Sequence, residues 1–166
     1  SRLLILHQGE GRTVLFLSAI AALAGFGLSI GRASSDALFF TQYGAVHLPQ
    51  MFALIALVLI PFSLAYAAFV DRLTPYRMFV HLLLGFAAMV GISWLVMSAA
   101  GGKIGIALYF ISYGVISELL LTHFAHYVSA FFDVQQGKRL LPSVMAIFRV
   151  GAILGGVFLG LAGSGM

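Results

Sequence analysis

Residues 133–163 read DVQQGKRLLPSVMAIFRVGAILGGVFLGLAG, a charged segment that leads directly into a glycine-rich apolar run. Pro142 suits the first turn of a helix, because an N–H at that position has no acceptor within the helix. The stretch therefore predicts a membrane helix from Pro142 to about Gly163. Lys138 and Arg139 are expected in the loop before it, on the cytoplasmic side of the membrane.

Two pairs of glycines mark the expected packing faces of this helix. Gly151 and Gly155 are four residues apart, as are Gly156 and Gly160, so each pair leaves a small face on one side of a helix. Small residues at this spacing let the backbones of two membrane helices approach closely. We expect these faces to contact protein.

The composition places the chain in a membrane. Hydrophobic residues make up 61% of it and charged residues 8%, whereas about a quarter of a soluble domain is charged. Cysteine is absent, so disulfides and thiolate metal sites are excluded. The net charge of +4 comes from scattered basic residues, which indicates loop bias and no nucleic-acid partner.

The apolar runs predict an all-α polytopic bundle in which residues 1–166 form one transmembrane domain surrounded by lipid. The expected spans are 13–40, 49–70, 75–98, 104–132 and 142–163. Residues 1–12 are expected to form a short helix along the membrane interface. Because transporter halves commonly hold six helices, five spans predict a fragment of a longer chain whose C-terminal half is missing.

The distribution of Lys and Arg predicts the orientation. With the N-terminus inside, the outer side receives only Arg32 and Lys103, and Arg149 falls within a span. The inner side then carries most of the basic residues, namely Arg2, Arg12, Arg72, Arg77, Lys138 and Arg139. We therefore expect an inside N-terminus in a bacterial inner membrane.

Arg32 and Asp36 are the first candidate site residues. They are four residues apart at the end of the first span, so they share a helix face and can pair. An arginine fork held within the membrane can bind a phosphate or a carboxylate. The alternative is an ion pair at the membrane rim that stabilises the helix end.

Glu118 and Arg149 are the other charged residues expected within spans. A carboxylate near mid-membrane is costly, so Glu118 is expected to face a cavity or a partner, or to be protonated. It is a candidate for binding a proton, a cation or a polar solute group, or a neutral acid bonded to a neighbouring helix. Arg149 either extends to the interface or faces the bundle as an anion contact.

Asp71, Arg72 and Arg77 lie in the loop between the second and third spans. Together with Lys138 and Arg139 they are candidates for a conformational latch, because charge pairs at helix ends can favour one of two access states. The alternative is charge that only sets the topology.

Histidine and aromatic residues complete the candidates. His81 and His126 are expected near the inner ends of neighbouring spans, where two histidines can ligate a haem or chlorophyll metal or simply hydrogen bond. We expect no cofactor and no metal. Tyr109, Tyr113 and Trp94 are expected to face lipid or the interface.

Two segments carry a family resemblance. The loop DRLTPYR at 71–77 resembles the loop between the second and third helices of the major facilitator superfamily. Arg32-xxx-Asp36-x-Leu38, and KRLLP at 138–142 with the following GAILGG, resemble the ATP/ADP translocase family and related bacterial membrane proteins. The chain departs from that family at Ser35 and Gln136, where the family carries lysine and glutamate.

The resemblance implies the N-terminal half of a twelve-helix secondary carrier for a small anionic or nucleotide-like solute. The alternative is a carrier-like subunit without transport activity that serves as a scaffold in a larger membrane complex, which the two departures favour. No nucleophile motif, phosphate loop or metal cluster is present in the sequence, so we expect no enzyme activity.

Overall fold

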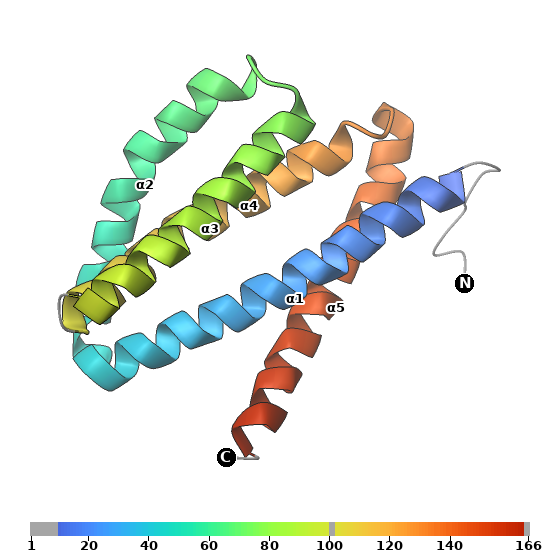
Figure 1. The fold of residues 1–166 in the computed structure, drawn as a ribbon. Helices are drawn as coiled ribbons and strands as arrows, with labels where there is room; N and C mark the ends of the chain where they lie inside the picture. The colour runs from blue at the N-terminus through green and yellow to red at the C-terminus, as the bar shows by residue number, and fades with distance from the viewer. Residues whose placement is uncertain (1–9, 100–101, 165–166) are drawn as a thin grey trace. The chain divides into compact units, whose positions relative to one another are not determined.

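The computed structural model describes residues 10–99 and 102–164, and every element within these ranges is helical (Figure 1). The elements are α1 (Glu10–Tyr43), the short 3-10 helix η1 (Ala45–His47), α2 (Leu48–Val70), α3 (Pro75–Ala99), α4 (Lys103–Ser129) and α5 (Val134–Ser164). The five long helices are each apolar and long enough to cross a membrane. The predicted all-α transmembrane bundle is confirmed. The expected interfacial helix falls mostly on residues 1–9, outside the described residues.

Glycine and proline lie at several helix ends. Gly44 ends α1 with φ of +74°, a conformation that favours glycine. Pro49 lies in the first turn of α2 and Pro61 lies inside it. Pro75 is the first residue of α3, and the hydroxyl of Thr74 accepts a hydrogen bond from the N–H of Arg77 at 3.4 Å. Thr74 therefore caps α3.

The start of α5 differs from the prediction. The helix begins at Val134, because the Asp133 carboxylate accepts hydrogen bonds from the N–H groups of Gln135 and Gln136 at 2.9 and 2.8 Å. In return, the Gln136 side chain accepts one from the N–H of Asp133 at 3.3 Å. This reciprocal pairing is a capping box, and it starts the helix one turn beyond the end of α4.

Pro142 is therefore interior to α5, and the prediction that it opens the helix is wrong. Proline has no N–H to bond the carbonyl four residues earlier, that of Lys138. Lys138 and Arg139 correspondingly belong to the helix and not to a loop before it. Membrane helices tolerate such a proline because neighbouring groups can satisfy the freed carbonyl.

The chain divides into two compact units, which we call the terminal unit (residues 1–30 and 125–166) and the central unit (residues 31–124). In the central unit α4 forms the core. The ring of Phe110 stacks on Phe39 of α1 at 4.3 Å, and Phe124 lies 6.1 Å from Phe79 of α3. Gly114 of α4 is packed by Ile55 of α2. Helix α2 has no buried residue, so α4 is the inner helix of this unit.

The terminal unit is held by close contact of α1 and α5, which cross in Figure 1. A side chain on Gly151 would collide with the carbonyl oxygen of Ala22, and one on Gly25 with that of Phe148. At Gly155 the Cβ position lies 2.7 Å from the carbonyl oxygen of Phe26. These contacts require glycine, because no Cβ fits between the two backbones.

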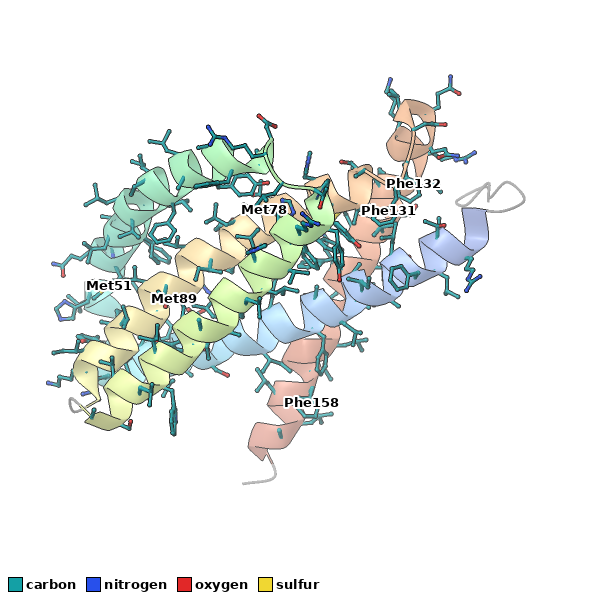
Figure 2. The ribbon with its side chains drawn as sticks, turned by 45° about the horizontal axis from the view of Figure 1, so that its top comes forward. Met51, Met78, Met89, Phe131, Phe132 and Phe158 are labelled. Atoms are coloured by element: carbon teal, nitrogen blue, oxygen red, sulfur yellow. The ribbon has the colours of Figure 1, made fainter. Side chains whose placement is uncertain are left out.

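The second glycine pair does not make such a contact. The Cβ position of Gly156 comes no closer than 4.0 Å to Ser29, and no described atom lies within 4 Å of that of Gly160. Farther along α5, Phe158 (Figure 2) instead contacts Phe26 with ring centroids 5.8 Å apart. Of the two predicted packing faces, the one with Gly151 and Gly155 packs against α1, whereas the one with Gly156 and Gly160 is open among the described residues.

Candidate functional site

Arg32 and Asp36 form the predicted pair on α1. The Nε–H of Arg32 donates to Oδ2 of Asp36 at 3.2 Å, and Nε lies 3.1 Å from Oδ1 in the same ion pair. The two side chains are 39% and 34% exposed. The pair therefore retains an open side.

The position of the pair on α1 places it deep within a span. Arg32 lies about 16 Å from the Tyr43 end of the helix at the usual rise of 1.5 Å per residue. The hydrocarbon core of a bilayer is about 30 Å thick. The Tyr43 end is fixed at the start of α4, because the Tyr43 hydroxyl donates to the carbonyl of Lys103 at 2.8 Å. The pair therefore lies about three turns inside the Tyr43 end of α1.

The guanidinium of Arg32 is only partly used by its protein contacts. Its carbon lies 5.7 Å from the centre of the Phe110 ring, a cation–π contact that supports one face. Within the described part of the chain, its two terminal nitrogens donate no hydrogen bond. A guanidinium held through Nε with its terminal N–H groups unused can bind a planar carboxylate or a phosphate.

Tyr109 and Tyr113 of α4 complete the site. The Tyr109 hydroxyl donates to the carbonyl of Gly31 at 3.4 Å. The ring and hydroxyl of Tyr113 lie 2.6 Å from the position that a Cβ on Gly31 would take, and the side chain is buried. The prediction that these tyrosines face lipid or the interface is wrong for Tyr113. The sequence does contain a sign of this burial, because Tyr109 and Tyr113 lie one helical turn apart in the middle of a span, where their hydroxyl groups need polar partners. Trp94, by contrast, is exposed, as expected.

Glu118 lies on the outer surface of α4. It is exposed, as is Thr122 one turn farther along the helix. Within the described residues Glu118 makes no hydrogen bond or ion pair, and it is not part of the wall of the apolar cavity described below. The structure therefore does not show the neighbouring-helix hydrogen bond considered for it. Arg149 is likewise exposed on α5 and makes no ion pair with a described residue.

Within the described residues of the central unit, Asp71 forms no ion pair with Arg72 or Arg77. Asp71 and Arg72 lie in the turn after α2, and Arg77 belongs to the first turn of α3. Lys138 is exposed on α5, whereas Arg139 is partly buried. The structure thus shows Asp71, Arg72 and Arg77 near helix ends of the central unit.

Of the two candidate histidines, His81 makes a hydrogen bond, the alternative to metal ligation. His81 is exposed and its Nδ1 hydrogen bonds the carbonyl of Arg77 within its own helix at 2.6 Å, and His126 is exposed on α4. No metal-binding group of three or more ligands occurs among residues 10–99 and 102–164. The buried histidine is His123, which hydrogen bonds Tyr66 and the carbonyl of Pro75. Sequence spacing alone did not distinguish it from His126.

The central unit also holds an apolar cavity of about 280 Å³ between α2, α3 and α4. Its wall includes Phe62 of α2, Met89 of α3 (Figure 2) and Ile111 of α4. Ser112 is its one hydroxyl-bearing wall residue, and that hydroxyl donates to the carbonyl of Tyr109 at 3.2 Å. A cavity with no free polar group suits hydrocarbon and does not suit a charged solute.

Five helices that are each apolar and long enough to cross a membrane indicate an integral membrane protein of the polytopic helical class. The chain matches no family model, no curated protein and no solved structure.

Proposed function

We propose that the chain is part of a secondary membrane carrier that moves a small anionic solute by alternating access. The observation that carries this proposal is the Arg32 guanidinium, which is held deep in a span with its terminal N–H groups unused. A charged side chain at the centre of a membrane helix costs about 3 kcal/mol on insertion scales. Such residues commonly mark a solute or ion path.

The other charged residues have roles in this proposal that follow from their positions. Glu118 and Arg149 belong to the solute or coupling-ion path, because each carries an intramembrane charge that needs water or a polar partner. Asp71, Arg72 and Arg77, with Lys138 and Arg139, act at the helix ends, where they favour one access state. The N-terminus is inside a bacterial inner membrane, as the basic residues indicate.

The proposed carrier has the architecture of a major-facilitator half, in line with the resemblance of the loop at 71–77 and of the segment at 138–142. In such folds the solute binds at mid-membrane and the two halves move around it. The ATP/ADP translocase resemblance favours a phosphorylated or nucleotide-like solute.

Uptake into proteoliposomes tests this proposal. The full chain is reconstituted and supplied with labelled inorganic phosphate or adenosine monophosphate. Arg32→Gln is expected to abolish uptake while the protein remains folded, and Arg32→Lys to restore little, because an ammonium lacks the bidentate fork. Arg12→Gln is the matched control, since Arg12 is exposed in the first turn of the same helix. Uptake unchanged in Arg32→Gln would remove Arg32 from the path.

A second candidate function is a carrier-like subunit without transport activity in a larger membrane complex. The exposed Glu118 favours it, because a carboxylate on a membrane helix requires a partner that the described residues do not provide. A photo-crosslinking amino acid at position 118 distinguishes the two. Specific capture of one membrane polypeptide, with no uptake of either probe, supports the subunit, whereas capture of lipid with active uptake supports the carrier.

A further inference from the structure

We propose that the cavity between α2, α3 and α4 binds the acyl chain of a membrane phospholipid. The proposal does not depend on the carrier function, and all the residues that line the cavity belong to the central unit. It starts from the way in which α2 packs on α4, because two contacts hold these helices together and the cavity wall of α2 lies between them.

The two contacts fasten α2 near both of its ends. The Cβ position of Gly114 lies 2.8 Å from Cδ1 of Ile55, so α2 comes close to the backbone of α4 there. Three turns farther along α2, the hydroxyl of Tyr66 lies 2.9 Å from Nδ1 of His123. The middle of α2 is therefore suspended between two attachment points on the same neighbouring helix.

Pro61 explains why α2 leaves space between these points. It lies between Val58 and Phe62, the two residues through which α2 lines the cavity. Proline has no N–H for the carbonyl of Leu57, four residues earlier, and its ring collides with that carbonyl, so the helix bends. Figure 1 shows α2 bent partway along its length. We attribute the cavity to this bend.

The chemistry and size of the cavity fit a hydrocarbon chain. Its one hydroxyl-bearing wall residue, Ser112, already donates to the carbonyl of Tyr109. Water needs two or more polar partners to occupy a cavity, and an apolar cavity of about 150 Å³ stays dry and binds benzene. The present cavity has a volume of about 280 Å³. It therefore has room for a longer run of methylene groups than benzene provides.

The position of the cavity supplies the occupant. Its wall residues include Met89 and Ile116, which lie near the middle of α3 and α4. The middle residues of a helix that crosses a bilayer lie among the lipid tails. Phe62 at the rim is 47% exposed, so the central unit leaves a way in from the side. Met89 has a flexible thioether chain that can adapt to a tail.

Photo-crosslinking in bilayers tests the proposal. The full chain is reconstituted in phosphatidylcholine that carries a diazirine near the end of one acyl chain. Illumination should link this lipid to residues 111–116 of α4, because buried side chains of this segment, such as Val115, line the cavity. Leu64 of α2 is 67% exposed and should be labelled by the surrounding bilayer in every sample, which calibrates the yield. A diazirine beside the headgroup should leave residues 111–116 unlabelled.

Two variants at one position provide the matched comparison. Val115→Phe fills the cavity, so labelling of residues 111–116 should fall to background while Leu64 stays labelled. Val115→Ala enlarges the cavity and should keep the labelling. If Val115→Phe does not fold, Ile111→Trp fills the space from a wall position that is already partly exposed.

The outcomes are decisive for the lipid site alone. No labelling of residues 111–116 in the unmodified protein, with Leu64 labelled, would overturn the proposal. Labelling that persists in the filled variant, or that is equal for a diazirine beside the headgroup, would overturn it as well. None of these results bears on the carrier function, because no uptake is measured.

Discussion

Nδ1 of His123 lies 2.9 Å from the hydroxyl of Tyr66, while Nε2 of the same ring lies 2.9 Å from the carbonyl oxygen of Pro75. A carbonyl only accepts, so Nε2 carries the proton and Nδ1 accepts from the Tyr66 hydroxyl. The ring is fully buried. One neutral imidazole thus fastens α4 to the last turns of α2 and to the first residue of α3, on either side of the loop that holds Asp71.

Replacing His123 should therefore loosen this loop. His123→Phe keeps an aromatic ring and leaves the Tyr66 hydroxyl without its acceptor, which should lower the free energy of unfolding by about 2 kcal/mol. Tyr66→Phe should cost about 1 kcal/mol, and the double variant should cost less than the sum. Denaturation in detergent measures all three. His126→Phe, at an exposed position of the same helix, is the control, and an equal loss there would contradict the specific role of His123.

Gly151 and Gly160 of α5 offer a matched comparison of two glycines on one helix. Gly151→Ala brings a Cβ against the carbonyl oxygen of Ala22, whereas no described atom lies within 4 Å of a Cβ at position 160. The first substitution should destabilise the protein by about 2 kcal/mol, because the backbones of α1 and α5 must separate. Gly160→Ala should be neutral or slightly stabilising, since alanine favours a helix interior. Resistance to denaturation in detergent distinguishes them, and equal stability of the two variants would show that the α1–α5 contact is not glycine-dependent.

The helices and the ion pair were predictable from sequence for local reasons. In a membrane, the backbone N–H and C=O groups of a long apolar run find their hydrogen-bond partners within a helix. A spacing of four residues places Arg32 and Asp36 on one face of that helix whatever surrounds them. The start of α5 also has a local signal, because Asp133 and Gln136 have the spacing of a capping box, but Pro142 suits a first helical turn as well and predicts a later start.

The remainder of the site depends on tertiary packing. Nothing local to Tyr113 indicates that its ring will fill the space above Gly31, a residue far away in sequence. The exposure of Glu118 also depends on tertiary packing, since α4 is an inner helix that buries many of its other positions. Which face stays open is decided by where α1, α2 and α3 pack.

The capping box of α5 predicts a local effect. Asp133→Ala removes the acceptor for the N–H groups of Gln135 and Gln136, so it should cost about 1 kcal/mol and fray the first turn. Hydrogen exchange of the amides at 135–137 should accelerate, while amides beyond Pro142 remain protected. Gln135→Ala is the control, because its side chain takes no part in the cap. Unchanged exchange in Asp133→Ala would show that α5 begins elsewhere.

The contact of Tyr113 with Gly31 supports the Arg32 site directly, because Arg32 is the next residue. Gly31→Ala places a Cβ within 2.6 Å of the ring and hydroxyl of Tyr113, so one helix must shift. We expect a loss of about 2 kcal/mol in the free energy of unfolding and, under the carrier proposal, weaker phosphate uptake. Gly27→Ala, one turn earlier on α1 with no described atom within 4 Å of its Cβ position, should keep both stability and uptake. Wild-type behaviour of Gly31→Ala in both measurements would contradict the packing of Tyr113 against α1.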